Sequence, residues 1–353
     1  MSTTRPHRHS FLRSHRLLFA AAAVLVVAVA AIATVLAGRP DQPSRLALPL
    51  QSIGETALPG DSSRFDYASL DAGRGLLFIA HLGASEVIET DVRTGRVLRT
   101  IGGLSGVHGV LVVPGLHRVY ATATSDNAMV ILDEDTGRVL SRTPTGEYPD
   151  GLAYDPTRGT IWTTNETGGS ETVIDAATGA PRGSVDLGGD AGNVVFDAAT
   201  GQILVDVQGR NELAVIDPAT LTITRRVPLP GCDHDHGLSL DPDQGVAFIA
   251  CDGNARLLTL DLARWHITGT DQVGQDPDVL AYDASAHRLY VAAESGWVTV
   301  LDNNNGRLAV TGSAYLADGA HVVAVDPTTH RSYYPVPHGK DGHPALLAYQ
   351  PIP

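Results

Sequence analysis

The sequence predicts an all-β fold, a seven-bladed β-propeller, preceded by one N-terminal transmembrane or signal-anchor helix. Three observations lead to this prediction: a repeat of about 42 residues, short Val, Ile and Leu runs separated by Gly, Asp and Thr, and one uncharged apolar segment near the N-terminus. Glycine is abundant, at 37 of 353 residues, whereas aromatic residues make up only 5%. This mixture favours many short strands joined by tight turns over a helical protein.

The apolar segment 17–38 reads LLFAAAAVLVVAVAAIATVLAG and carries no charge. As a helix it would be about 33 Å long, enough to cross a hydrocarbon core of about 30 Å. Residues 1–16 contain four Arg and no acid, which predicts a cytoplasmic tail and places the rest of the chain outside. We therefore expect a single-pass protein of the cell membrane, held in the membrane by this helix. Cleavage after the small residues near Ala33 and Ala37 would instead give a secreted protein.

The charge of the chain argues against a nucleic-acid partner, and its motifs argue against a haem or nucleotide cofactor. Residues 1–40 hold five of the 25 basic residues and none of the 39 acidic ones, so the remainder has a net charge of −19. Such a surface repels phosphate backbones, and we expect no nucleic-acid partner. The sequence contains no C-x-x-C-H motif, P-loop or dinucleotide fingerprint. We therefore expect no covalent haem and no bound nucleotide.

The repeat contains an apolar strand that ends in Asp and is often followed by Thr-Gly, as in MVILDEDTG at 129–137 and TVIDAATG at 172–179. Four short strands per repeat of this length are typical of propeller blades. In the D-x-x-T-G turn the Asp side chain accepts backbone hydrogen bonds and the Gly adopts positive φ. These Asp residues are therefore predicted to be structural. They recur 41 to 44 residues apart, at Asp91, Asp133, Asp175, Asp217, Asp261 and Asp302.

Counting repeats from Phe65 gives seven blades, and the last of them ends after its third strand. Residues 53–60 resemble 223–231, the fourth strand of another blade. We therefore predict that 53–60 close the ring as the missing strand, which removes exposed sheet edges. On this interpretation residues 39–52 are a linker and 53–353 are the propeller.

Several motifs resemble the YVTN-repeat, YncE-like family of seven-bladed propellers. They are HRVYATA at 117–123, HRLYVAA at 287–293, the D-x-x-T-G turns, SRFDY at 63–67 and GVHGV at 106–110. The resemblance covers about residues 46–350 and implies the propeller fold. It implies little about activity, because the family is defined by its repeat and includes many kinds of extracytoplasmic protein.

Candidate functional residues recur at the start of the innermost strand of each blade, so they should meet at one mouth of the central pore. Imidazoles near carboxylates suit Zn, Cu, Fe or Mn, so we predict a transition-metal site formed by His108, His236 and His321. An alternative is that these Asp and His side chains bond neighbouring backbone amides. The seven positions are Asp66, His108, Asp150, Gly192, His236, Asp278 and His321, with Asn193 beside the fourth.

Blade 5 contains the densest cluster of polar residues, Gly231-Cys-Asp-His-Asp-His-Gly237. Cys232 and Cys251 should lie close together, and in an exported protein they are predicted to form a disulfide. Ligation of a soft metal such as copper by Cys and His is the alternative. The residues predicted to bind a ligand at this face are Asp66, Asp150, Asp278, Asn193, His234, Asp235, Asp252 and Glu294. Other polar residues that leave second strands at this face are His81, Asn165, Glu166 and His338.

Three functions fit this pattern. The first is an extracytoplasmic, membrane-anchored binding module that accepts a small molecule or a protein at this face and holds a metal at the pore mouth. The second is a metal-dependent lyase or hydrolase that uses the His and Asp ring, one member serving as general base. The third is a structural repeat without a site.

Overall fold

The computed structural model describes residues 43–352. In this part of the chain no helix is long and apolar enough to cross a membrane. The predicted cytoplasmic tail, 1–16, and the predicted anchor, 17–38, lie outside the described residues.

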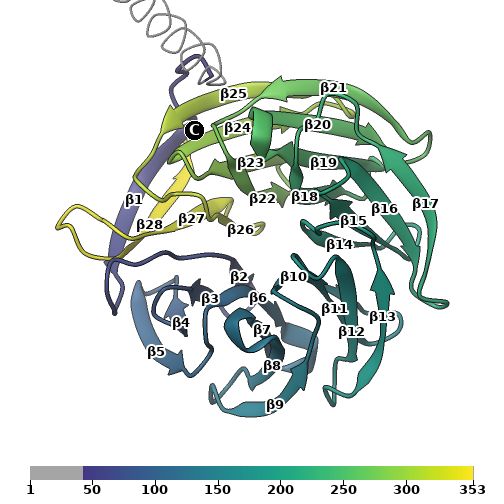
Figure 1. Ribbon diagram of the computed structural model, residues 1–353. Helices are drawn as coiled ribbons and strands as arrows, with labels where there is room; N and C mark the ends of the chain where they lie inside the picture. The colour runs from purple at the N-terminus through teal and green to yellow at the C-terminus, as the bar shows by residue number, and fades with distance from the viewer. Residues whose placement is uncertain (1–42, 353) are drawn as a thin grey trace, which may run out of the picture. The chain divides into compact units, whose positions relative to one another are not determined.

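The described residues form seven four-stranded antiparallel sheets arranged as blades around one axis (Figure 1). This confirms the predicted all-β, seven-bladed propeller. Blade 1 contains β2 (Ala68–Asp71), β3 (Leu76–His81), β4 (Glu86–Asp91) and β5 (Arg96–Gly102). Blade 2 contains β6 (Val107–Val113), β7 (Arg118–Ala123), β8 (Ala128–Asp133) and β9 (Val139–Pro144). Blade 3 contains β10 (Pro149–Asp155), β11 (Thr160–Asn165), β12 (Ser170–Asp175) and β13 (Pro181–Asp186).

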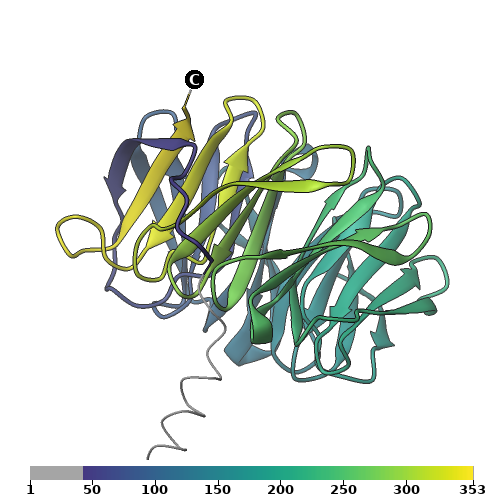
Figure 2. The ribbon, with the colours of Figure 1, turned by 90° about the horizontal axis from the view of Figure 1, so that it is seen from above.

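The remaining blades repeat the order from the axis outward, and Figure 2 shows them edge-on. Blade 4 contains β14 (Val194–Asp197), β15 (Gln202–Val207), β16 (Glu212–Asp217) and β17 (Thr222–Pro228). Blade 5 contains β18 (Asp235–Asp241), β19 (Val246–Cys251), β20 (Arg256–Asp261) and β21 (His266–Gln272). Blade 6 contains β22 (Pro277–Asp283), β23 (Arg288–Ala293), β24 (Trp297–Asn303) and β25 (Leu308–Tyr315). Single 3-10 turns follow β6, β7 and β19, at Pro114–Leu116, Thr124–Asp126 and Asp252–Asn254.

Blade 7 is built from both ends of the propeller. Its strands are β26 (Ala324–Asp326), β27 (Arg331–Val336), β28 (Ala345–Pro351) and, outermost, β1 (Leu50–Ala57). The closing strand thus begins and ends three residues before the predicted 53–60. The strand begins early because Leu50 is buried and pairs with Pro351. It ends early because Pro59 has no N–H to donate to a ladder.

The predicted linker, 39–52, also needs correction over its described residues. Leu46 and Ser313 exchange backbone hydrogen bonds of 2.8 Å, which joins this segment to the outer strand of blade 6. The last three residues of the predicted linker belong to β1. The chain is therefore fixed against the propeller before the closing strand begins.

The hydrophobic core lies between neighbouring blades. All six residues of β3 and of β19 are buried, because a middle strand has another blade against each of its faces. Outer strands instead alternate between exposed and half-buried residues, as in β21. This difference explains why middle strands have continuous apolar sequences and outer strands do not.

The recurring Asp residues have the predicted structural role. Oδ1 of Asp91 accepts hydrogen bonds from the backbone N–H groups of Arg93 and Thr94, at 2.8 and 3.2 Å. Gly95 completes the turn with φ of 67°. At Asp133, Oδ1 likewise accepts the backbone N–H of Thr136, at 2.9 Å. Asp302 is the exception, because its carboxylate pairs with the side chain of Arg288 and Asn303 makes the turn bond instead.

Candidate functional site

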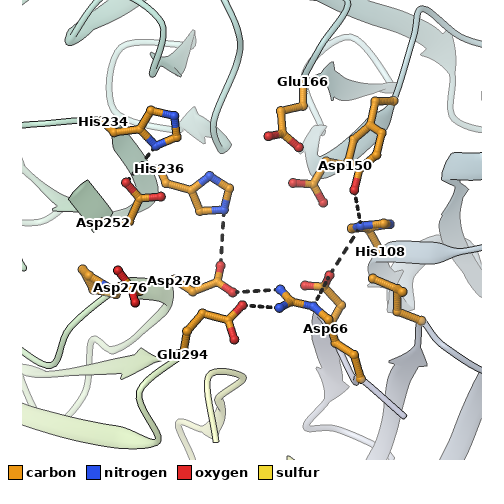
Figure 3. Close-up of a pocket in the computed structure, with 14 residues that line it drawn as sticks. Asp66, His108, Asp150, Glu166, His234, His236, Asp252, Asp276, Asp278 and Glu294 are labelled. Carbon is orange, nitrogen blue, oxygen red and sulfur yellow. Dashed lines mark hydrogen bonds and ion pairs between the residues drawn. The ribbon is translucent and has the colours of Figure 1, made fainter. Parts of the chain in front are cut away.

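A polar cavity of about 460 Å³ lies at one mouth of the pore (Figure 3). Its lining combines seven carboxyl groups with three imidazoles and one guanidinium. Six of the eight predicted ligand-binding residues line it, and Asn193 and Asp235 do not. The lining residues are Arg64, Asp66, Leu82, His108, Tyr148, Asp150, Glu166, His234, His236, Asp252, Asp276, Pro277, Asp278 and Glu294.

Irregular starts of the innermost strands bring polar side chains to this mouth. In blades 2, 3, 5 and 6 the register between the first and second strand shifts at His108, Asp150, His236 and Asp278. A bulge of this kind re-aims a side chain relative to the sheet. In blades 1, 4 and 7 the corresponding residue precedes a shorter innermost strand.

Glycine follows three of these residues because the neighbouring blade approaches closely. A Cβ atom at Gly109 would lie 2.2 Å from the carbonyl oxygen of Asp150, and one at Gly237 would lie 2.2 Å from that of Asp278. At Gly151 it would meet Oδ1 of Asn193 at 2.7 Å. These three pairs, His108-Gly109, Asp150-Gly151 and His236-Gly237, therefore lie where neighbouring blades touch at the axis.

Arg64 is the functional residue that the sequence interpretation missed. It lies in the segment between β1 and β2, with its side chain 42% exposed. Nε lies 3.7 Å from Oδ2 of Asp66, and Nη2 lies 3.6 Å from Oδ2 of Asp278. Nη1 also pairs with Glu294. The signal was its position two residues before Asp66, which in an extended chain puts both side chains on the same side.

His236 carries a positive charge at neutral pH. Burial by itself lowers the pKa of this imidazole, but its hydrogen bond to Asp278 and the charges of Asp278, Asp150 and Asp252 raise it to about 10. Nε2 faces Oδ1 of Asp278 at 3.3 Å, and Nδ1 donates to Oε1 of Gln208 at 3.0 Å. Both ring nitrogens are thus engaged.

The axial carboxyl groups differ in charge. Burial and the charges of Asp278 and Asp150 raise the pKa of Asp66 well above its usual value. Burial likewise raises the pKa of Asp150, to about 6. Burial would also raise the pKa of Asp278, but the His236 hydrogen bond and the charges of His236, His321 and Arg64 lower it overall. Asp278 therefore ionises most readily of the three.

His321 does not line this cavity and is only 2% exposed. Its Nδ1 is 3.4 Å from Oε2 of Glu294, and its Nε2 is 3.9 Å from Oδ2 of Asp278. Neither ring nitrogen makes a hydrogen bond to another described residue. Asp66, Asp278 and His321 each offer a ligand atom, and these atoms lie within 4.8 Å of one another.

This group replaces the predicted set of three imidazoles, of which only His321 belongs to it. His108 donates from Nδ1 to the carbonyl of Gly106 at 2.8 Å, and its Nε2 lies 3.1 Å from the hydroxyl of Tyr148. Blades 6, 7 and 1 are consecutive, so the carboxylates of Asp278 and Asp66 reach His321 from either side. Blades 2 and 5, which carry the other two imidazoles, are not adjacent to blade 7.

The two predicted residues that do not line the cavity have other neighbours. Asn193 donates to the hydroxyl of Tyr67 at 2.7 Å and lines a second cavity, of about 310 Å³, along the innermost strands. Asp235 is fully buried and pairs with Cys251 in the sheet of blade 5.

Cys232 and Cys251 form a disulfide, with their Cα atoms 5.3 Å apart. The alternative, copper ligation by these cysteines, needs free thiols and does not fit this pairing. The disulfide fixes the segment that presents His234 and His236. Nδ1 of His234 lies 2.7 Å from Oδ1 of Asp252, at the rim of the cavity.

No protein-family model matches the sequence, and no curated protein is detectably similar to it. Solved structures are similar in fold. The structure of U3-55K has a TM-score of 0.72 at 11% identity, covering 84% of this chain and 98% of that one. A chain in the crystal structure of the mitotic checkpoint complex has a TM-score of 0.72 at 10% identity, covering 88% of this chain and 94% of that one. At these identities the likeness shows the propeller fold alone.

Proposed function

We propose that this chain is a binding module that holds a divalent transition-metal ion at its pore mouth, between Asp66, Asp278 and His321. The observation that carries this proposal is the buried imidazole of His321, with both ring nitrogens free of hydrogen bonds and two carboxylates beside it. A buried polar group without a partner costs about 1–3 kcal/mol. A bound ion would remove that cost.

The chemistry of the donors indicates the class of ion. One imidazole nitrogen and two carboxylate oxygens suit Zn, Fe or Mn better than Ca or Mg, which prefer oxygen alone. Three protein ligands leave a coordination position open for water or a ligand. Asp66 and Asp278 line the cavity of about 460 Å³, which gives access to that position.

Other features bear on the compartment in which the module works and on its partner. The disulfide suits an oxidising compartment, which supports the proposed position outside the membrane. A propeller of similar fold belongs to a protein complex, the mitotic checkpoint complex, and a partner protein is accordingly part of this proposal. Membership of the YVTN-repeat family, the membrane anchor and the lyase or hydrolase alternative stay predictions.

Titration of the purified full-length protein with ZnCl2 and MnCl2 by calorimetry tests the proposal. We expect one ion per chain, and His321→Gln should weaken binding roughly 100-fold or more, because water cannot replace an imidazole that coordinates the ion at equal affinity. His330→Gln is the matched control. Nδ1 of His330 bonds Asp283, and both residues lie in turns at the ends of the innermost strands that are away from the pore mouth. Absence of binding in the wild type, or equal binding by His321→Gln, would overturn the proposal.

A further inference from the structure

We infer that Arg64 is a resident cation of the pore mouth, and that a metal ion binds there only when the Arg64 guanidinium leaves. This inference rests on the proposed metal site and names the residue that regulates it. Arg64 pairs with Asp66 and Asp278, two of the three proposed ligands, and with Glu294.

The carboxylates cannot serve both cations at once. Oδ2 of Asp278 faces Nη2 of Arg64 at 3.6 Å and also faces Nε2 of His321 at 3.9 Å. Glu294 pairs with Arg64 through Oε1, while its Oε2 lies 3.4 Å from Nδ1 of His321. The guanidinium therefore faces carboxylate oxygens of Asp66 and Asp278 that would bind the metal.

Charge repulsion opposes joint occupancy. A divalent ion bound by Asp66 and Asp278 would lie beside the guanidinium of Arg64, whose nitrogens are 3.7 and 3.6 Å from those two carboxylates. Like charges a few ångströms apart repel strongly where water is scarce. Movement of Arg64 removes this positive charge and frees the carboxylate oxygens.

Arg64 can leave by side-chain rotation once its hydrogen bond from Nη1 to Glu294 breaks. Its distances to Asp66 and Asp278, 3.7 and 3.6 Å, are longer than hydrogen bonds, and 42% of the side chain is exposed. Its backbone is fixed, because the carbonyl of Arg64 accepts the N–H of Gly83 at 3.1 Å. The N–H of Asp66 bonds the carbonyl of Ala80 at 2.9 Å. The segment would therefore stay in place while the guanidinium turns toward solvent.

Calorimetric titration with ZnCl2 tests the inference on full-length wild-type protein, Arg64→Gln and Arg64→Lys. We expect Arg64→Gln to bind Zn²⁺ roughly tenfold or more tightly than the wild type, because one competing charge is gone. Arg64→Lys keeps the charge but lacks the fork that reaches three carboxylates, so its affinity should lie between the two. Arg210→Gln is the charge-matched control, since Arg210 pairs with Glu212 and does not line the cavity.

Thermal unfolding gives a second readout that separates competition from a purely structural role. Without metal, Arg64→Gln should melt below the wild type, because three carboxylates lose their cation. With saturating Zn²⁺ its melting temperature should rise by more than that of the wild type. Equal or weaker Zn²⁺ binding by Arg64→Gln would overturn the inference while leaving the metal site intact. Loss of binding in every protein, wild type included, would refute the proposed function and the inference with it.

Discussion

His236 and Asp278 form an ion pair across the boundary between blades 5 and 6, with Nε2 of the imidazole 3.3 Å from Oδ1 of the carboxylate. Each residue stabilises the charged form of the other. The pKa of His236 rises to about 10 against the effect of its burial, and that of Asp278 falls. The pair therefore joins two innermost strands and sets the charge of the pore mouth.

The His236–Asp278 pair should make stability depend on pH. The folded-state pKa of His236, about 10, lies above the value of about 6.5 for a free imidazole. The stabilisation is therefore complete below about pH 6.5 and is lost as the pH rises toward 10. Over this window the free energy of unfolding of the metal-free wild type should fall more than that of His236→Gln, by up to about 5 kcal/mol, because each unit of pKa shift corresponds to about 1.4 kcal/mol. Parallel curves in chemical denaturation would contradict this.

Glu134 should give a separate dependence at lower pH. Burial, with the neighbouring Asp71 carboxyl, raises the pKa of Glu134 to about 7. A carboxyl whose pKa is raised on folding binds its proton more tightly in the folded state, so stability declines as the pH rises from about 4.5 to 7. Glu134→Gln should flatten this slope, whereas the exposed Glu147→Gln should leave it unchanged. Denaturation midpoints between pH 4 and 8 provide the measurement.

The disulfide should contribute substantially to stability. Cys232 and Cys251 are separated by 19 residues, and closing a loop of this size stabilises a fold by about 3 kcal/mol. The Cys232→Ser, Cys251→Ser double variant should lose roughly that amount. Thiol titration of denatured, unreduced wild type should find no free thiol, and two thiols would refute the pairing.

Close contact between innermost strands makes Gly237 sensitive to substitution. In Gly237→Ala the added Cβ would meet the carbonyl oxygen of Asp278 at 2.2 Å, so one strand must shift. We expect a loss of about 1–3 kcal/mol, as for other overpacked sites. Gly54→Ala in β1 is the control, because a Cβ there meets no atom within 4 Å. Similar melting temperatures for the two variants would show that the strands adjust without cost.

Ring closure depends on β1. Deletion of residues 45–60 removes this strand and leaves β28 with an unpaired edge. The deleted protein should show no cooperative thermal transition, or one far below that of the wild type. An unchanged transition would mean that the ring closes in another way.

The repeat predicted the blade number and the pore-mouth positions because both follow from local patterns. The Asp of the turn recurs in the sequence every 41 to 44 residues. The exact closing strand was harder to predict, since it depends on pairing Leu50 with Pro351. Those two residues are neighbours only in the finished ring.

The side-chain partners at the mouth could not be predicted from the repeat. Arg64 lies outside the repeated positions, and it reaches blade 6 from the segment before blade 1. His321 matches the ring position, but its grouping with Asp66 and Asp278 depends on which blades are adjacent after closure. Periodicity places residues at one face, and the ring then decides which of them meet.

The pairing of β1 with β28 also determines when the molecule can finish folding. Strand β1 is synthesised before every other strand of the propeller, and its partner is synthesised last, about 300 residues later. Until the ribosome completes the C-terminal segment, β1 has no ladder to join. A nascent or truncated chain would therefore leave β1 free, open to proteases and to pairing with other chains. Completion of the last strand protects both ends of the propeller in one step.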